Sequence, residues 1–166
     1  KHVIVGHSER RKYFNETNEL LYKKIKILLE NSLCPVFCFG ESIHARNKGD
    51  YLDFIERQLE DVIMLFSQNE LSNILLAYEP VWAIGSGSSA NELQINEVHT
   101  FVRDLIEKKY GSMYAEKIPI LYGGSCNSDN TSIILRQPNV DGLLIGGASL
   151  SNDHFHQIIQ LANSLD

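Results

Sequence analysis

The sequence has no long apolar run, and its first residues do not resemble a signal peptide. No apolar stretch approaches the roughly 20 residues that span a lipid bilayer. Lys1 and His2 run directly into a short strand-like segment and do not have the layout of a signal peptide. We therefore expect a protein of the cytoplasm that does not insert into a membrane.

Cysteine is also scarce. Cys34, Cys38 and Cys126 are odd in number, and their spacing fits neither a disulfide framework nor a zinc site. We interpret them as reduced thiols that pack in the core. His154 and His156 are a weak indication of a metal site. We interpret them as two partly exposed residues of a helix. We expect no metal and no cofactor.

Basic residues are fewer than acidic residues. The chain of 166 residues has 15 Lys and Arg against 21 Asp and Glu, which gives a net charge of -6. This balance argues against nucleic acid as a partner, although a local positive field can still hold a small anion. Hydrophobic residues make up 43% and charged residues 22%, as in an ordinary globular protein.

Five apolar segments alternate with amphipathic ones. The strand-like segments are residues 2–6, 35–40, 73–79, 118–124 and 140–147. Helical spacing of apolar residues predicts helices over 17–31, about 52–66, a stretch that Asn91 caps, about 129–136 and a last stretch. The predicted inner faces of the third and last helices are Leu93, Val98, Phe101, Val102, Leu105 and Ile106, and Phe155, Ile158, Ile159 and Ala162. Residues 7–14 and 41–50 are expected to be polar loops.

This alternation predicts one α/β domain over residues 1–166 with a parallel sheet and right-handed crossovers. Two architectures fit the pattern: a doubly wound open sheet, or part of a closed (β/α)8 barrel. Both place ligands at the carboxyl ends of the strands. The first residue is not Met, so we expect the chain to be a fragment.

Polar residues and glycines gather at those strand ends. They are His7 to Glu9, Gly40 and Glu41, Glu79, Gly123 to Ser125, and Gly146 and Gly147. Each alone has an ordinary structural explanation: a hydrogen-bonded histidine, a solvated ion pair, or a tight turn. An ordinary structural explanation fits Glu79 less well, because Glu79 directly follows an apolar strand and Pro80 then restricts the backbone.

The glycine turns predict an anion site. Backbone N–H groups of Ser125, Gly146 and Gly147 can converge on a dianion, and a helix beginning near Ala148 adds a favourable dipole. A phosphate site at the last two loops is a recurrent feature of (β/α)8 barrels. We therefore expect a small phosphorylated molecule as ligand.

The stretch after Glu79 allows two interpretations. Gly85-x-Gly87-x-x-Ala90 matches the glycines of a dinucleotide-binding turn, but six residues, 79–84, separate the strand from Gly85. The acidic candidates further on, Asp104 and Glu107, fall inside a predicted helix. We therefore interpret this stretch as a hinged lid that covers the site. A dinucleotide-binding oxidoreductase remains a less favoured alternative.

Four segments resemble the triosephosphate isomerase family in order and approximate spacing. They are "VGHSERR" at 5–11, "AYEPVWAIGSG" at 77–87, "YGGS" at 122–125 and "DGLLIGGASL" at 141–150. The resemblance implies a TIM barrel, of which this chain represents the C-terminal five of eight units. It also implies interconversion of dihydroxyacetone phosphate and glyceraldehyde 3-phosphate by a homodimer, without metal or cofactor.

The resemblance also implies residue roles. Glu79 is the base, His7 the electrophile and Glu9 an organising neighbour; the phosphate is held by Gly85, Ser125, Gly146 and Gly147. This family is the usual example of a histidine kept neutral by a helix N-terminus and of a closing lid. Where its lid usually has lysine and threonine, this chain has Ser88 and Ser89.

The family's first strand supplies an asparagine and a lysine that have no counterpart in this sequence. Loss of the lysine removes a charge that stabilises the phosphate and the enediolate, so we expect the chain alone to have little or no isomerase activity. The alternative from another class is a non-catalytic phosphate-binding or assembly module of open-sheet type.

Overall fold

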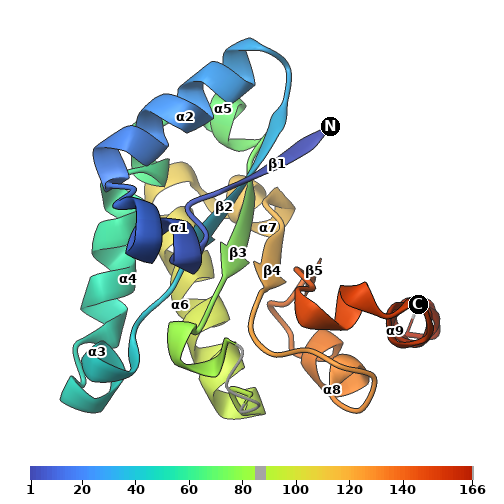
Figure 1. Cartoon of the computed structure of the whole chain (residues 1–166). Helices are drawn as coiled ribbons and strands as arrows, with labels where there is room; N and C mark the ends of the chain where they lie inside the picture. The colour runs from blue at the N-terminus through green and yellow to red at the C-terminus, as the bar shows by residue number, and fades with distance from the viewer. Residues whose placement is uncertain (85–88, 166) are drawn as a thin grey trace.

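A computed structural model describes residues 1–84 and 89–165. Its centre is a five-stranded parallel sheet in which each strand pairs with the next strand along the chain (Figure 1). Four strands lie within the segments that the sequence predicted, and β2 begins one residue before its predicted segment, at Cys34. The strands are β1 (His2–Val5), β2 (Cys34–Phe39), β3 (Leu75–Tyr78), β4 (Ile120–Tyr122) and β5 (Gly142–Leu143).

Helices follow every strand. The longer ones are α2 (Asn18–Glu30), α4 (Tyr51–Glu60), α6 (Glu92–Tyr110) and α9 (Asn152–Asn163). The shorter helices are α1 (Ser8–Phe14), α3 (Ile43–Lys48), α5 (Gln68–Leu71), α7 (Ser112–Lys117) and α8 (Thr131–Leu135), and the 3-10 turns are η1 (Ile63–Leu65), η2 (Val81–Ala83) and η3 (Gly147–Leu150). No helix in the described ranges is long and apolar enough to cross a membrane.

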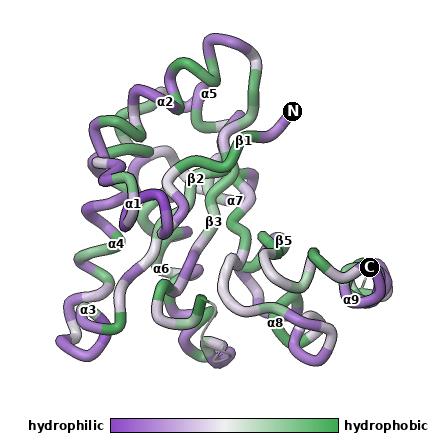
Figure 2. The backbone as a smooth tube through the Cα atoms, in the orientation of Figure 1, coloured by the Kyte–Doolittle hydropathy of each residue, from purple (hydrophilic) through white to green (hydrophobic). Residues whose placement is uncertain are grey.

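The two faces of the sheet bury different side chains, because successive residues of a strand point to opposite faces. Large side chains such as Phe37 and Tyr78 join the helices in the main core. Val36, Cys38 and Ala77 form a separate small cluster on the other face. The apolar strands stand out in the centre of Figure 2, with more polar helix surfaces around them.

This arrangement decides between the two predicted architectures. A doubly wound sheet reverses its strand order and carries helices on both faces. Here the order is sequential and the main core lies on one face. The fold is therefore α/β and is that of a partial TIM barrel, represented by five strand and helix units.

Two predicted loops are wrong. Residues 8–14 and 43–48 form helices α1 and α3. Each begins with a side-chain cap: the His7 ring accepts from the N–H of Glu9, and Ser42 Oγ accepts from the N–H of Ala45. Such caps satisfy N–H groups at the start of a helix, so short polar segments can be helical without an apolar stripe.

Two other helices differ in detail from the prediction. The expected long helix ends at Glu60, and the apolar residues after it are buried around η1 instead. In α6, which Asn91 caps as predicted, the buried stripe begins at Ile95 and includes His99. Leu93 lies outside this stripe and is 81% exposed, so its assignment to the inner face was wrong.

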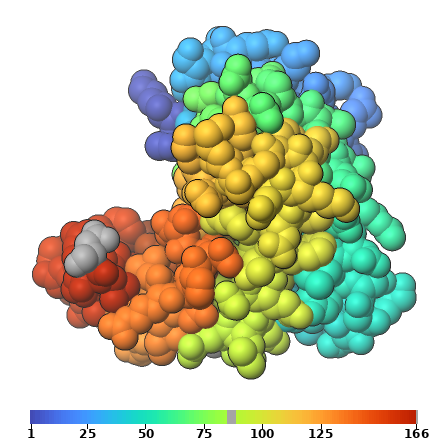
Figure 3. Space-filling view, turned by 180° about the vertical axis from the view of Figure 1, so that it is seen from behind, coloured from blue at the N-terminus to red at the C-terminus, as the bar shows by residue number. Residues whose placement is uncertain are grey.

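The last helix is only partly covered. Of its predicted inner face, Ile158 is buried, whereas Phe155 and Ile159 are exposed. They border a groove of about 800 Å³ that also includes residues of β5. Figure 3 shows this C-terminal part projecting from the rest of the molecule.

The ends of β2 and β3 approach each other closely. A Cβ on Gly40 would stand 1.8 Å from the carbonyl oxygen of Glu79, well inside van der Waals contact. Gly40→Ala should therefore lower the free energy of unfolding by about 3 kcal/mol or more, measured by urea denaturation. Gly49 also has positive φ but has open space around it. Gly49→Ala should cost only about 1 kcal/mol, and equal losses in the two variants would show that the clash at Gly40 is not the cause.

Candidate active site

The strand ends meet at one pocket of about 270 Å³. Its walls come from the residues that follow β1, β3, β4 and β5, as expected for the carboxyl edge of a parallel sheet. The lining residues include His7, Glu79, Gly123, Gly124, Ser125, Gly146 and Gly147. The structure thus brings together the predicted histidine, the predicted carboxylate and two of the glycine turns.

Glu79 directly follows β3 and is 2% exposed. Its N–H donates to the carbonyl oxygen of Phe39 at 2.7 Å, which extends the pairing of β3 with β2 by one residue. Its carboxylate Oε2 accepts from the N–H of Ser8 at 3.0 Å. Gly123 leaves room for the side chain, since a Cβ there would lie 3.1 Å from Glu79 Cγ.

Burial raises the pKa of the Glu79 carboxyl above its ordinary value of 4.5. The nearby His7, the N–H of Ser8, the thiol of Cys38 and the guanidinium of Arg11 oppose this effect but do not cancel it. Burial destabilises the ionised form of a carboxylate. Proton uptake therefore lowers the free energy of a buried carboxylate more than that of an exposed one. Glu79 is therefore suited to act as a general base.

His7 occupies the N-cap of α1 and lies half-buried beside Glu79. Its Nδ1 accepts from the N–H of Glu9 at 3.3 Å, so Nδ1 carries no proton. The remaining ring nitrogen, Nε2, then carries the proton and lies 3.2 Å from Glu79 Oε1. The hydrogen bond from the N–H of Glu9 to Nδ1 thus assigns a neutral imidazole, whose Nε2–H group faces the pocket as a donor.

Glu9 lies in the first turn of α1. Its side chain is exposed, and its link to the site is the backbone N–H that donates to His7. The carboxylate of Glu9 is not part of the pocket lining. Glu9 thus orients the imidazole through its main chain.

Two glycine turns contribute to the lining of this pocket. Gly146 and Gly147 lead into η3 and Ser125 follows β4, and all three line the same cavity as Glu79. Among the described residues, the lining of this pocket includes no lysine and no arginine. Gly85, the remaining predicted phosphate ligand, lies outside the described residues.

Three contributors were missed from the sequence. Ser8 acts through its main chain, and Cys38 is fully buried, packing on the small-residue face of the sheet. Arg11 donates to the carbonyl oxygens of Gly6 at 2.8 Å and Cys38 at 3.1 Å, so it ties the end of β1 to β2. The alternation of residues in strand 35–40 could have placed Cys38 on the face below the site, but nothing in the sequence pointed to Arg11.

The raised pKa of Glu79 predicts a pH-dependent stability. The folded state holds the Glu79 proton at a pH where the unfolded carboxyl, with its ordinary value of 4.5, has lost it. Ionisation of Glu79 therefore reduces stability as the pH rises from 4.5 through the folded pKa. Glu79→Gln should gain stability relative to the unmodified chain over this window, as measured by urea denaturation at several pH values.

The control for this measurement is Glu30→Gln, at the exposed end of α2. This variant removes one carboxylate outside the pocket, and the pH dependence of Glu79→Gln is compared with it. A stability difference for Glu79→Gln that stays constant or shrinks as the pH rises would refute the assignment.

Comparison with known proteins places this site in a family. The family profile described as Triosephosphate isomerase matches residues 1–162. The triosephosphate isomerase of Porphyromonas gingivalis is 46% identical over 160 residues, which cover 96% of this chain and 64% of the relative. That of Bacteroides fragilis is 46% identical over 163 residues, 98% of this chain and 64% of the relative. That of Phocaeicola vulgatus is 47% identical over 159 residues, covering 96% and 63%.

The chain thus spans a little under two thirds of the length of these relatives. The match nevertheless extends over all five strands and includes every strand end that lines the pocket. The chain belongs to the triosephosphate isomerase family.

Proposed function

We propose that this chain carries the base, the electrophile and the phosphate cradle of a triosephosphate isomerase. One observation carries the proposal: a buried carboxylate and the N–H donor of a neutral imidazole face the same glycine-lined pocket. The substrates are dihydroxyacetone phosphate and glyceraldehyde 3-phosphate, in keeping with the names of the relatives.

The reaction moves one proton between two neighbouring carbons and one proton between their oxygens, so that the carbonyl group changes place. The carboxylate of Glu79 removes a proton from the hydroxymethyl carbon of dihydroxyacetone phosphate, and the electron pair left behind forms the carbon–carbon double bond of an enediolate. The Nε2–H group of His7 donates to the developing negative charge on oxygen. Glu79 then returns the proton to the neighbouring carbon, while the hydroxyl proton on the first carbon's oxygen passes to the oxygen of the second carbon, and the first carbon becomes the aldehyde.

The geometry supports these roles. Nε2 of His7 lies 3.2 Å from Glu79 Oε1, and both residues line the same pocket, so one small ligand in this pocket can contact both. Ser125, Gly146 and Gly147 supply N–H groups for the phosphate in the same cavity. The proposal involves no metal and no cofactor, since the reaction involves no net oxidation.

We also propose that the chain is a single domain and that the protein works in the cytoplasm as a homodimer. The support for a dimer is a surface on α1 where Tyr13 and Phe14 are 65% and 66% exposed. Aromatic side chains with this exposure are enriched at protein interfaces. A non-catalytic module of open-sheet type has less support, because the main core lies on one face of the sheet.

The activity can be tested in two forms of the protein. The first is the chain alone, for which we predict little or no turnover because the described pocket lining has no lysine. The second is a chimaera in which the N-terminal third of the Bacteroides fragilis relative precedes residue 1. A coupled assay should detect robust isomerase activity in the chimaera, whereas robust turnover by the chain alone would overturn the argument about the lysine.

In the same chimaera, Glu79→Gln should lower kcat by several orders of magnitude because the amide cannot accept the carbon proton. Glu79→Asp should also slow proton transfer, since it shortens the side chain, and His7→Gln should reduce the rate by roughly 100-fold or more. Glu30→Gln provides the matched control and should retain full activity. Near-normal turnover in Glu79→Gln would remove Glu79 as the base.

A further inference from the structure

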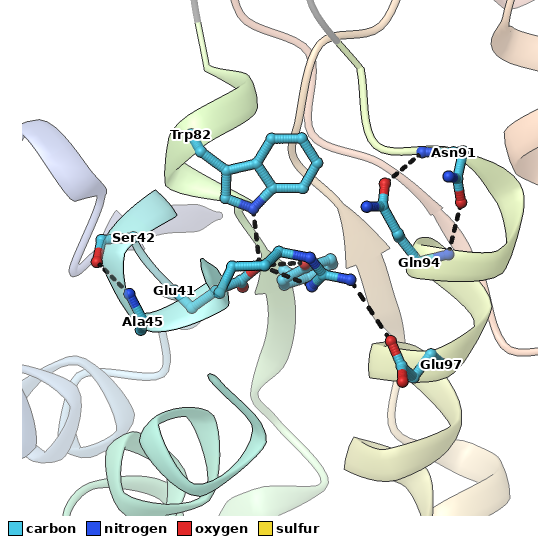
Figure 4. A network of polar contacts seen from close by, with 9 residues as sticks. Glu41, Ser42, Ala45, Trp82, Asn91, Gln94 and Glu97 are labelled. Atoms are coloured by element: carbon cyan, nitrogen blue, oxygen red, sulfur yellow. Dashed lines mark hydrogen bonds and ion pairs between the residues drawn. The ribbon is translucent and has the colours of Figure 1, made fainter. Parts of the chain in front are cut away.

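A second polar cluster adjoins the site, with the carboxylate of Glu41 at its centre (Figure 4). Glu41 is fully buried at the end of β2. Its Oε1 accepts hydrogen bonds from Arg46 Nη1 at 2.9 Å, from the Tyr78 hydroxyl at 3.1 Å and from Trp82 Nε1 at 2.8 Å. Its Oε2 is buried and has no partner among the described residues, so the charge depends on the donors at Oε1.

Arg46 is the cation of this cluster and is itself mostly buried, with a side chain that is 12% exposed. Its second guanidinium nitrogen lies 3.5 Å from Glu97 Oε2 on α6. The guanidinium also lies 4.3 Å from the ring centre of Tyr51 and 5.6 Å from that of Trp82. Arg46 therefore contacts the end of β2, the segment after β3 and the helix α6 at once.

The cluster is joined to Glu79 through a short piece of chain. The carbonyl oxygen of Glu41 accepts from the N–H of Val81 at 3.1 Å, and Trp82 follows in the next position. Trp82 is only three residues from Glu79, and Pro80 between them restricts the backbone. A shift of the Glu41 carboxylate would therefore be transmitted along the segment that carries Glu79.

We infer that Arg46 is a positioning residue for Glu79. Its guanidinium holds the Glu41 carboxylate against the indole N–H of Trp82 and connects this contact to α6 through Glu97. These contacts fix the position of the segment after Glu79 relative to the pocket. The catalytic consequence rests on the proposed function, but the structural link does not. An ordinary stabilising ion pair would affect stability and leave the placement of Trp82 and the turnover unchanged.

Arginine suits this role for a physical reason. A buried carboxylate that loses its cation either takes up a proton or moves toward water. Either change weakens the hydrogen bond to Trp82, because a charged acceptor binds an N–H group more strongly than a neutral one does. Lysine retains the charge but cannot contact Glu41 and Glu97 with a planar fork. Arg46→Lys should therefore restore part of the effect that Arg46→Met removes.

The link can be measured in this chain directly, because Trp82 is its single tryptophan. In folded Arg46→Met, acrylamide should quench the Trp82 fluorescence about twofold more efficiently than in the unmodified chain, because the lost hydrogen bond frees the indole. Arg46→Lys should be intermediate. Arg136→Met, at the exposed end of α8, is the matched control and should leave quenching unchanged. Unchanged quenching in folded Arg46→Met would overturn the inference.

The catalytic consequence is measured in the chimaera. Arg46→Met should lower kcat by roughly 10-fold to 100-fold at nearly unchanged KM, since misplacing a catalytic group has costs of this order. Arg46→Lys should recover part of kcat, and Arg136→Met should match the unmodified chimaera. A normal kcat in Arg46→Met, or a change in KM alone, would overturn the positioning role.

Two further outcomes keep the inference separate from the proposed function. If Arg46→Met does not fold, Arg46→Lys takes its place, and wild-type quenching and kcat in that variant would overturn the inference. If no form of the protein shows turnover while Trp82 still responds to Arg46→Met, the isomerase proposal fails and the link between Arg46 and Trp82 holds.

Discussion

The buried carboxylate of Glu79 is the constraint on which the rest of the site depends. A carboxylate that is 2% exposed needs space and hydrogen-bond donors at the end of a strand. Gly40 and Gly123 provide the space, because a side chain at either position would meet atoms of Glu79. Ser8 and His7 provide contacts at its two oxygens. The start of α1 is therefore arranged around a carboxylate that directly follows β3.

The parallel sheet explains how such distant residues meet. Every strand ends at the same edge, so residues more than 70 positions apart face one pocket. The small-residue face of the sheet carries Cys38 beneath Glu79, whereas the opposite face packs the large aromatic residues against the helices. Stability and chemistry are thus separated by the alternation of side chains along each strand.

Much of this could be predicted from the sequence, since the strands are short apolar runs and their ends carry the polar residues. The histidine, the carboxylate and the glycine turns follow from that pattern alone. Helices α1 and α3 could not be found by apolar spacing, because caps and tertiary contacts stabilise them. The role of Ser8 was equally hidden, because it acts through a main-chain N–H group, which looks the same in every residue type except proline. Glu9 was expected beside His7 from the family resemblance, but that it acts through its main chain could not be predicted.

The proposed function requires that the site recognise the charge distribution of an enediolate and not a phosphate group alone. The most direct measurement is calorimetric titration of the chain with a phosphorylated enediolate mimic and with inorganic phosphate. We predict that the mimic binds at least about tenfold more tightly, a difference of about 1.4 kcal/mol, and that Glu79→Gln removes this preference. Equal affinity for the two ligands in the unmodified chain would contradict enediolate recognition.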